Sequence, residues 1–169
     1  MHRVTRIGIT LAAVAALAAP PALAAKSVYN ARLSGSEEVP ARTTKATGHA
    51  TLRLTQDKST IEYRIVVGNI ENVITGRLHL GPAGTEGPEI ATLYGPTAPG
   101  AGKSSGVLVS GALAGANLVG PMAGKSIPEL IAAIEGGQVY VNLATDDGIG
   151  SPDERSGDFS SGEIRGQLK

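Results

Sequence analysis

The sequence predicts an all-β domain, an antiparallel Greek-key β-sandwich or barrel of about seven to eight strands with one short helix at residues 126–135. Short stretches alternate apolar and polar side chains with the period of two that strands require. The 23 glycines and 10 prolines separate these stretches and predict frequent turns. Only one segment carries helix start and stop signals, so repeated strand–helix–strand units are not expected.

The strands are expected in a regular order along the chain. The first covers residues 28–33 and precedes a polar loop at 34–45. Residues 48–55 and 60–67 alternate on both sides of a short polar turn, which is typical of a hairpin. Further strands are expected at 73–80, 90–94, 107–109, 138–143 and 162–168.

The alternation also predicts which side chains form the core. The residues expected to be buried are Leu52, Leu54, Ile61, Ile65, Leu78, Val141 and Ile164, and those expected to be exposed are Arg53, Glu62 and Arg165.

The helix has recognisable ends. Ser126 and Glu129 have the spacing of a capping box, Pro128 lies in the first turn, and Gly136 and Gly137 follow the last turn.

The first residues are typical of a secretory signal peptide. Arg3 and Arg6 precede an apolar run at 7–19, and Ala22-Leu23-Ala24 forms a cleavage site of small residues. The run is shorter than the about 20 residues that span a bilayer. We therefore expect a signal peptide at 1–24, a single domain at 25–169, and a periplasmic or extracellular location.

Composition excludes several classes of function. Without the leader the chain has 13 basic and 15 acidic groups and no basic stripe, so nucleic acid is not an expected partner. No later segment is apolar enough to cross a membrane. The chain has no cysteine, which excludes disulfides, thiol chemistry and cysteine-based zinc sites.

Four stretches, in order, resemble the CHRD domain, a family named for chordin. They are Ala31 to Pro40 (ARLSGSEEVP), Thr47 to Leu52 (TGHATL), Arg77 to Gly84 (RLHLGPAG) with Gly87-Pro88, and Val139 to Thr145 (VYVNLAT) with Gly162 to Leu168 (GEIRGQL). The resemblance covers almost the whole chain after the leader. It implies an all-β domain, and it implies an extracellular binding role only by analogy with chordin, which binds growth factors.

The chain departs from the family pattern at two histidines. Arg77 and Ala144 stand where the family usually has histidine, and the link at 145–161 is longer than usual. These departures argue against a metal site built on the family histidines.

The remaining histidines do not make a sufficient site by themselves. His2 belongs to the leader, and His49 and His79 alone cannot supply the three or four ligands of a zinc or copper site. Serines are plentiful, but His79 has no sequence-local partner with which to activate one as a hydrolase nucleophile. No cofactor and no catalytic residue are predicted.

An acidic loop offers a second hypothesis. Its carboxylates could form a weak calcium site, or could simply be solvated, and the EF-hand spacing is missing. They are Asp146, Asp147, Asp153, Glu154 and Asp158.

The most specific functional hypothesis is a polar patch on one sheet face. Its members are Arg77, His79, Asn142, Glu163 and Arg165, which alternate with predicted core residues. Glu163 is the expected ion-pair partner of Arg77. We expect a non-enzymatic binding module for an unknown protein or small ligand; the alternative is a metal-binding or hydrolytic protein that uses His79.

Overall fold

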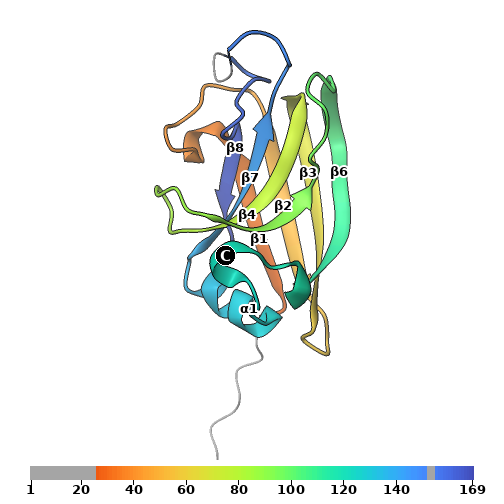
Figure 1. Cartoon of the computed structure of the whole chain (residues 1–169), viewed down its shortest axis with the longest axis vertical. Coiled ribbons are helices and arrows are strands. Elements are labelled where there is room, and N and C mark those ends of the chain that lie inside the picture. The colour runs from red at the N-terminus through yellow and green to blue at the C-terminus, as the bar shows by residue number, and fades with distance from the viewer. Residues whose placement is uncertain (1–25, 152–154) are drawn as a thin grey trace, which may run out of the picture.

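The computed structural model describes residues 26–151 and 155–169. The predicted signal peptide lies outside the described residues. The described chain forms one eight-stranded sheet that curls into a nearly closed barrel (Figure 1). The strands are β1 (Val28–Ser34), β2 (Thr47–Leu54), β3 (Thr60–Glu71), β4 (Val73–Leu80), β5 (Glu89–Tyr94), β6 (Lys103–Ala114), β7 (Val139–Thr145) and β8 (Ile164–Gln167).

The strand order is β5-β4-β7-β8-β1-β2-β3-β6, and every pairing is antiparallel. The predicted all-β class with about eight strands and one helix is confirmed. The edge strands approach each other, and the Tyr63 hydroxyl on β3 donates to the Leu93 carbonyl on β5 at 2.9 Å. This closure places side chains of alternate phase either inside the barrel or on its outer surface.

The barrel interior is an aliphatic core, as the alternation predicts. Leu52, Ile61, Ile65, Leu78 and Ile164 are completely buried. Val141 is also completely buried, while Arg53 and Glu62 are exposed as expected. Leu54 is only partly buried and packs against the core at the end of β2. Each buried side chain of this size contributes about 1.5–3 kcal/mol to the hydrophobic stabilisation.

Helix α1 (Ile127–Glu135) covers the lower end of the barrel in Figure 1. The predicted capping box is confirmed, since the Ser126 backbone N–H donates to the Glu129 carboxylate at 2.8 Å. Leu130 and Ile134 are buried on its apolar face. None of the helices in the described ranges is of a length and apolarity suited to crossing a bilayer.

Two strands run further than the sequence indicates. β3, expected at residues 60–67, continues to Glu71, and β6, expected at residues 107–109, runs from Lys103 to Ala114. Asn69 has a φ of 54°, and the β3–β6 register shifts between Val67 and Ile70. Gly68 and Asn69 therefore form a bulge within β3 instead of a turn that ends the strand.

The outer face of β7 and β8 is covered, so these strands are buried on both sides. All seven residues of β7 are buried. The covering segments are the loop that begins with the 3-10 helix η1 (Gly35–Glu37) and the loop at 81–88. This covering creates the environment of the candidate site.

Candidate functional site

Three members of the predicted polar patch form a row across neighbouring strands. Arg77 on β4 is paired in register with Asn142 on β7, and Asn142 is paired with Arg165 on β8. His79 lies two residues along β4, opposite Tyr140. Strand alternation therefore correctly places these four patch residues on adjoining positions of one face.

Glu163, the fifth member of the predicted patch, is fully buried and lies just before β8, two residues from Arg165. Its carboxylate accepts hydrogen bonds from the Thr145 hydroxyl at 2.8 Å, the Ser156 hydroxyl at 2.8 Å and the Gly157 backbone N–H at 2.9 Å. The Thr44 hydroxyl adds a fourth at 2.5 Å. Glu163 therefore anchors the loop at 155–163.

The expected ion pair of Arg77 with Glu163 is wrong. The Arg77 Nε lies 3.0 Å from the Glu89 carboxylate on β5, the other neighbour of β4. Both side chains are about one-third exposed. The strand order, which the sequence does not reveal, decides which carboxylate lies beside Arg77.

Arg165 is only 2% exposed, so its predicted exposure is also wrong. Its guanidinium lies over the Tyr140 ring, 3.4 Å from the centroid, and donates to the Pro82 carbonyl at 2.9 Å. The alternation correctly directs Arg165 away from the barrel interior. The loop at 81–88 then covers it, which strand periodicity does not predict.

His79 is held in a defined tautomer by its neighbours. Its ring stacks on Tyr140 with centroids 5.0 Å apart, and Nδ1 lies 2.9 Å from the Gly87 carbonyl. A carbonyl accepts only, so Nδ1 carries the proton. Burial lowers the pKa of His79, partly opposed by the Gly87 hydrogen bond. The neutral ring therefore offers Nε2 as a hydrogen-bond acceptor.

Glu38 is a site residue that the sequence reasoning missed. It is 9% exposed, and the Asn142 Nδ2 donates to both of its carboxylate oxygens at 3.1 Å. Burial raises the pKa of Glu38 to about 7, although the positive charges of Arg165 and Arg42 oppose this rise. The only sequence signal was its place in the ARLSGSEEVP stretch, since the loop has no periodicity.

The backbone around η1 and Gly162 fixes the position of Glu38. The Gly35 carbonyl accepts from the backbone N–H groups of Glu38 at 3.2 Å and Arg42 at 2.8 Å. Gly162 packs directly against the Glu38–Asn142 pair, so an added Cβ would lie 2.9 Å from the Glu38 carboxylate and closer to the Asn142 amide. Glycine at this position is therefore required by close packing and by its φ of 149°.

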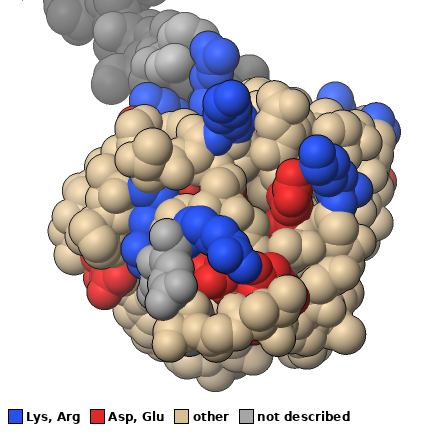
Figure 2. All heavy atoms as spheres, turned by 90° about the horizontal axis from the view of Figure 1, so that it is seen from above, with Lys and Arg blue, Asp and Glu red and all other residues tan. Residues whose placement is uncertain are grey.

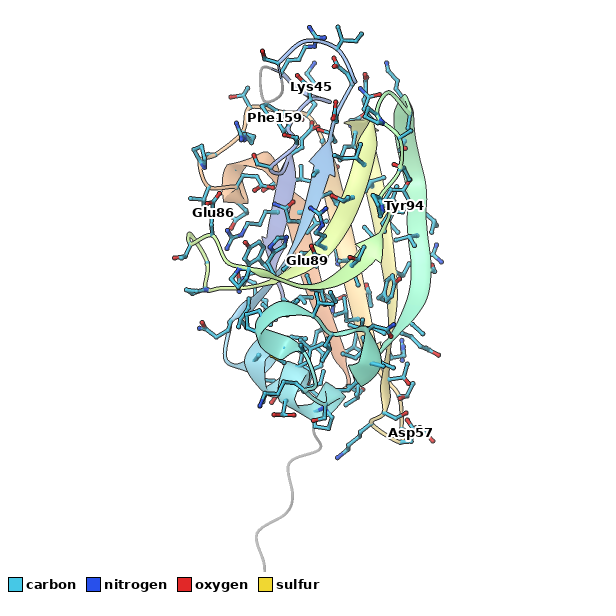
Figure 3. All side chains as sticks on the ribbon, in the orientation of Figure 1. Lys45, Asp57, Glu86, Glu89, Tyr94 and Phe159 are labelled. Atoms are coloured by element: carbon cyan, nitrogen blue, oxygen red, sulfur yellow. The ribbon has the colours of Figure 1, made fainter. Side chains whose placement is uncertain are left out.

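These groups surround a small polar cavity of about 130 Å³. Its lining consists of Glu38, His79, Glu86, Gly87, Tyr140, Asn142, Ser161 and Arg165. Glu86 projects from the 81–88 loop at the side of the barrel (Figure 3). The cavity presents carboxylate and imidazole acceptors beside a guanidinium donor, which suits hydrogen-bonded recognition of a small polar group.

The cavity has few features of a metal or catalytic centre. Among the described residues, the His, Asp and Glu side chains that converge in a group of three are Asp146, Asp147 and Asp158, on another part of the surface. His49 lies on β2, three strands beyond β7 in the sheet. The Arg165 cation beside His79 would repel a divalent ion.

The acidic loop holds three of the five predicted carboxylates close together. Ligand atoms of Asp146, Asp147 and Asp158 all lie within 4.8 Å of one another. Asp153 and Glu154 lie outside the described residues. Figure 2, viewed onto this end of the barrel, shows acidic groups recessed between basic side chains.

Comparison with known proteins gives one match. A model of the CHRD domain family matches residues 29–151, which includes β1 to β7 and all the cavity residues up to Asn142. A search of curated proteins and a search of solved structures each found no match.

Proposed function

Because the chain belongs to the CHRD domain family, we propose that it is an exported, non-enzymatic binding module whose recognition site is the Glu38–His79–Arg165 cavity. Export rests on the order of charged, apolar and small residues at 1–24. The binding role rests on the cavity.

The observation that carries the proposal is the burial of two ionisable side chains beside an accessible cavity. Arg165 is 2% exposed and Glu38 is 9% exposed. Burial of such groups opposes folding unless their polar atoms find partners. The Asn142 amide and the Pro82 carbonyl satisfy part of their hydrogen-bonding capacity. The fold brings Glu38, which directly follows η1, to the same cavity as Arg165 on β8. Recognition explains this arrangement better than stability does.

The dimensions and charges of the cavity restrict its ligand. A volume of about 130 Å³ accepts a few heavy atoms, the size of one side-chain terminus. Glu38 and Arg165 have opposite charges when both are ionised, so the site does not strongly favour an anion or a cation. We propose that it receives an uncharged group with donors and acceptors, such as an amide or hydroxyl at a loop tip of a partner protein.

The test is capture of partners from the envelope and medium fractions of the native cell by purified mature protein. The matched variant is His79→Phe, which keeps a ring against Tyr140 but removes the Nε2 acceptor and also the Nδ1–H donor to the Gly87 carbonyl. We expect His79→Phe to lose at least about tenfold in affinity for any protein that the wild type captures, because a buried polar group of the partner is left without its acceptor.

The control is Glu62→Gln, because Glu62 is exposed on β3, away from the cavity. Circular dichroism should show that both variants fold. Equal binding by wild type and His79→Phe would contradict the proposal, and so would the absence of any captured protein from both fractions.

A further inference from the structure

From the geometry of the loop that joins β7 to β8, we infer that Asp146, Asp147 and Asp158 form a calcium site at the end of the barrel opposite α1. This inference concerns a different surface from the recognition cavity and does not depend on that proposal.

The three carboxylates come from the two ends of one loop. Asp146 and Asp147 directly follow β7, and Asp158 lies just before the residues that lead into β8. Their ligand atoms lie within 4.8 Å of one another, a separation at which one cation can contact all three. Loops of this kind supply the oxygens of extracellular calcium sites.

Asp158 provides the second, independent observation. It is only 2% exposed, yet in the described part of the chain its carboxylate has no hydrogen-bond donor and no ion-pair partner. Its oxygen is instead directed toward the other two carboxylates. A buried anion beside two like charges is strongly unfavourable unless a cation compensates it.

The other two carboxylates are held in place and keep lone pairs available. Asp146 Oδ1 accepts the Gly148 N–H at 2.7 Å, and Asp147 Oδ1 accepts the Ile149 N–H at 2.8 Å. The Arg155 guanidinium lies 2.5 Å from Asp147 Oδ2, and its side chain is 61% exposed. The backbone N–H groups of Gly148 and Ile149 therefore preorganise two ligands.

The donor set indicates calcium among the common cations. All the side-chain ligands are carboxylate oxygens, which hard cations prefer. An irregular loop suits the six to eight flexible oxygens of Ca²⁺ better than the near-ideal octahedron of Mg²⁺. Backbone carbonyls and water would complete the coordination.

Calcium at this position would secure the upper end of the barrel. The Asp146 N–H donates to the Asn72 carbonyl at 2.9 Å, and the Asn72 side chain donates to the Gly157 carbonyl at 3.1 Å. Asn72 also accepts the Gly102 N–H at 2.8 Å through its side chain. The cation would therefore lock the β7–β8 loop onto the β3–β4 and β5–β6 connections.

The experiment compares thermal unfolding of the full mature protein in EDTA and in calcium chloride, together with calorimetric titration of calcium. At about one hundred times the Kd, calcium should raise the wild-type Tm by about 5–10 °C. Asp158→Asn keeps the side-chain shape but removes the charge. In EDTA this variant should be at least as stable as the wild type, and it should bind calcium at least about tenfold more weakly.

The matched control is Asp57→Asn, in the β2–β3 turn at the opposite end of the molecule (Figure 3). Its calcium-dependent rise in Tm should equal that of the wild type. No rise for the wild type up to about 10 mM calcium, well above the Kd range of weak extracellular sites, would overturn the inference. An equal rise for Asp158→Asn, or an equal response to magnesium, would also overturn the assignment to calcium.

Discussion

Replacing Glu38 with Gln should stabilise the protein at pH 8 much more than at pH 5. Gln keeps the shape of the side chain and an oxygen that can accept the hydrogen bond from Asn142. The substitution removes the carboxylate that burial makes unfavourable to ionise. The difference in unfolding free energy between variant and wild type therefore depends on pH.

The sign follows from the protons bound in each state. The pKa of Glu38 is raised from its ordinary value of 4.5 to about 7 in the folded protein. Between these values the folded state keeps the proton and the unfolded state releases it, so the contribution of Glu38 to stability falls as pH rises. This contribution is fully present below pH 4.5 and is lost as pH rises through about 7.

The expected size comes from the same two values. Integrated from pH 5 to pH 8, wild type should lose about 2–3 kcal/mol relative to Glu38→Gln. Urea unfolding of both proteins at the two pH values measures this difference, with an unchanged m value as evidence that the denatured state is the same. Exposed Glu62→Gln should shift by less than about 0.5 kcal/mol at either pH. A Glu38→Gln effect that is independent of pH would refute the reasoning.

The remaining predictions concern packing, the buried carboxylate and export. Gly162→Ala should lower the unfolding free energy by about 1–3 kcal/mol more than Gly124→Ala, because both have positive φ but only Gly162 faces crowded atoms; denaturant unfolding measures both, and equal losses would contradict the packing argument. Leu52→Ala should cost about 2–5 kcal/mol, and an unchanged Tm would show that the strand phase is wrong. Glu163→Gln should cost about 2–4 kcal/mol, because an amide nitrogen cannot accept the hydrogen bonds that the carboxylate receives; a loss below about 0.5 kcal/mol in urea unfolding would contradict this. The mature protein from the envelope or medium should begin within two residues of Ala25 when its N-terminus is sequenced. A mature chain that still begins at Met1 or His2 would contradict cleavage.

Periodicity predicted the parts of the molecule in which one face of a strand decides burial. Leu52, Ile61 and Ile65 alternate with exposed residues and line the barrel as expected. The same rule correctly set Arg77, Asn142 and Arg165 in phase with one another. It failed for the burial of Arg165 because a loop from a distant part of the chain covers the outer face, and alternation describes only the strand itself.

The centre of the cavity was harder to predict because it depends on the order of strands and the paths of loops. Glu38 lies in a loop without periodicity, and its partner Asn142 is 104 residues away. The pairing of Arg77 with Glu89 depends on β5 lying next to β4. Propensity and alternation are local signals, so neither identifies a contact between such distant segments.

Hydrogen–deuterium exchange of the mature protein with its captured partner tests the recognition site most directly. The partner should protect backbone amides at 35–40, 81–88 and 161–165, the three segments that surround Glu38 and Arg165. Amides in the β2–β3 turn at 55–59 should exchange as they do in the free protein. Protection confined to that turn or to the exposed faces of β3 and β6 would contradict the assignment of recognition to the cavity.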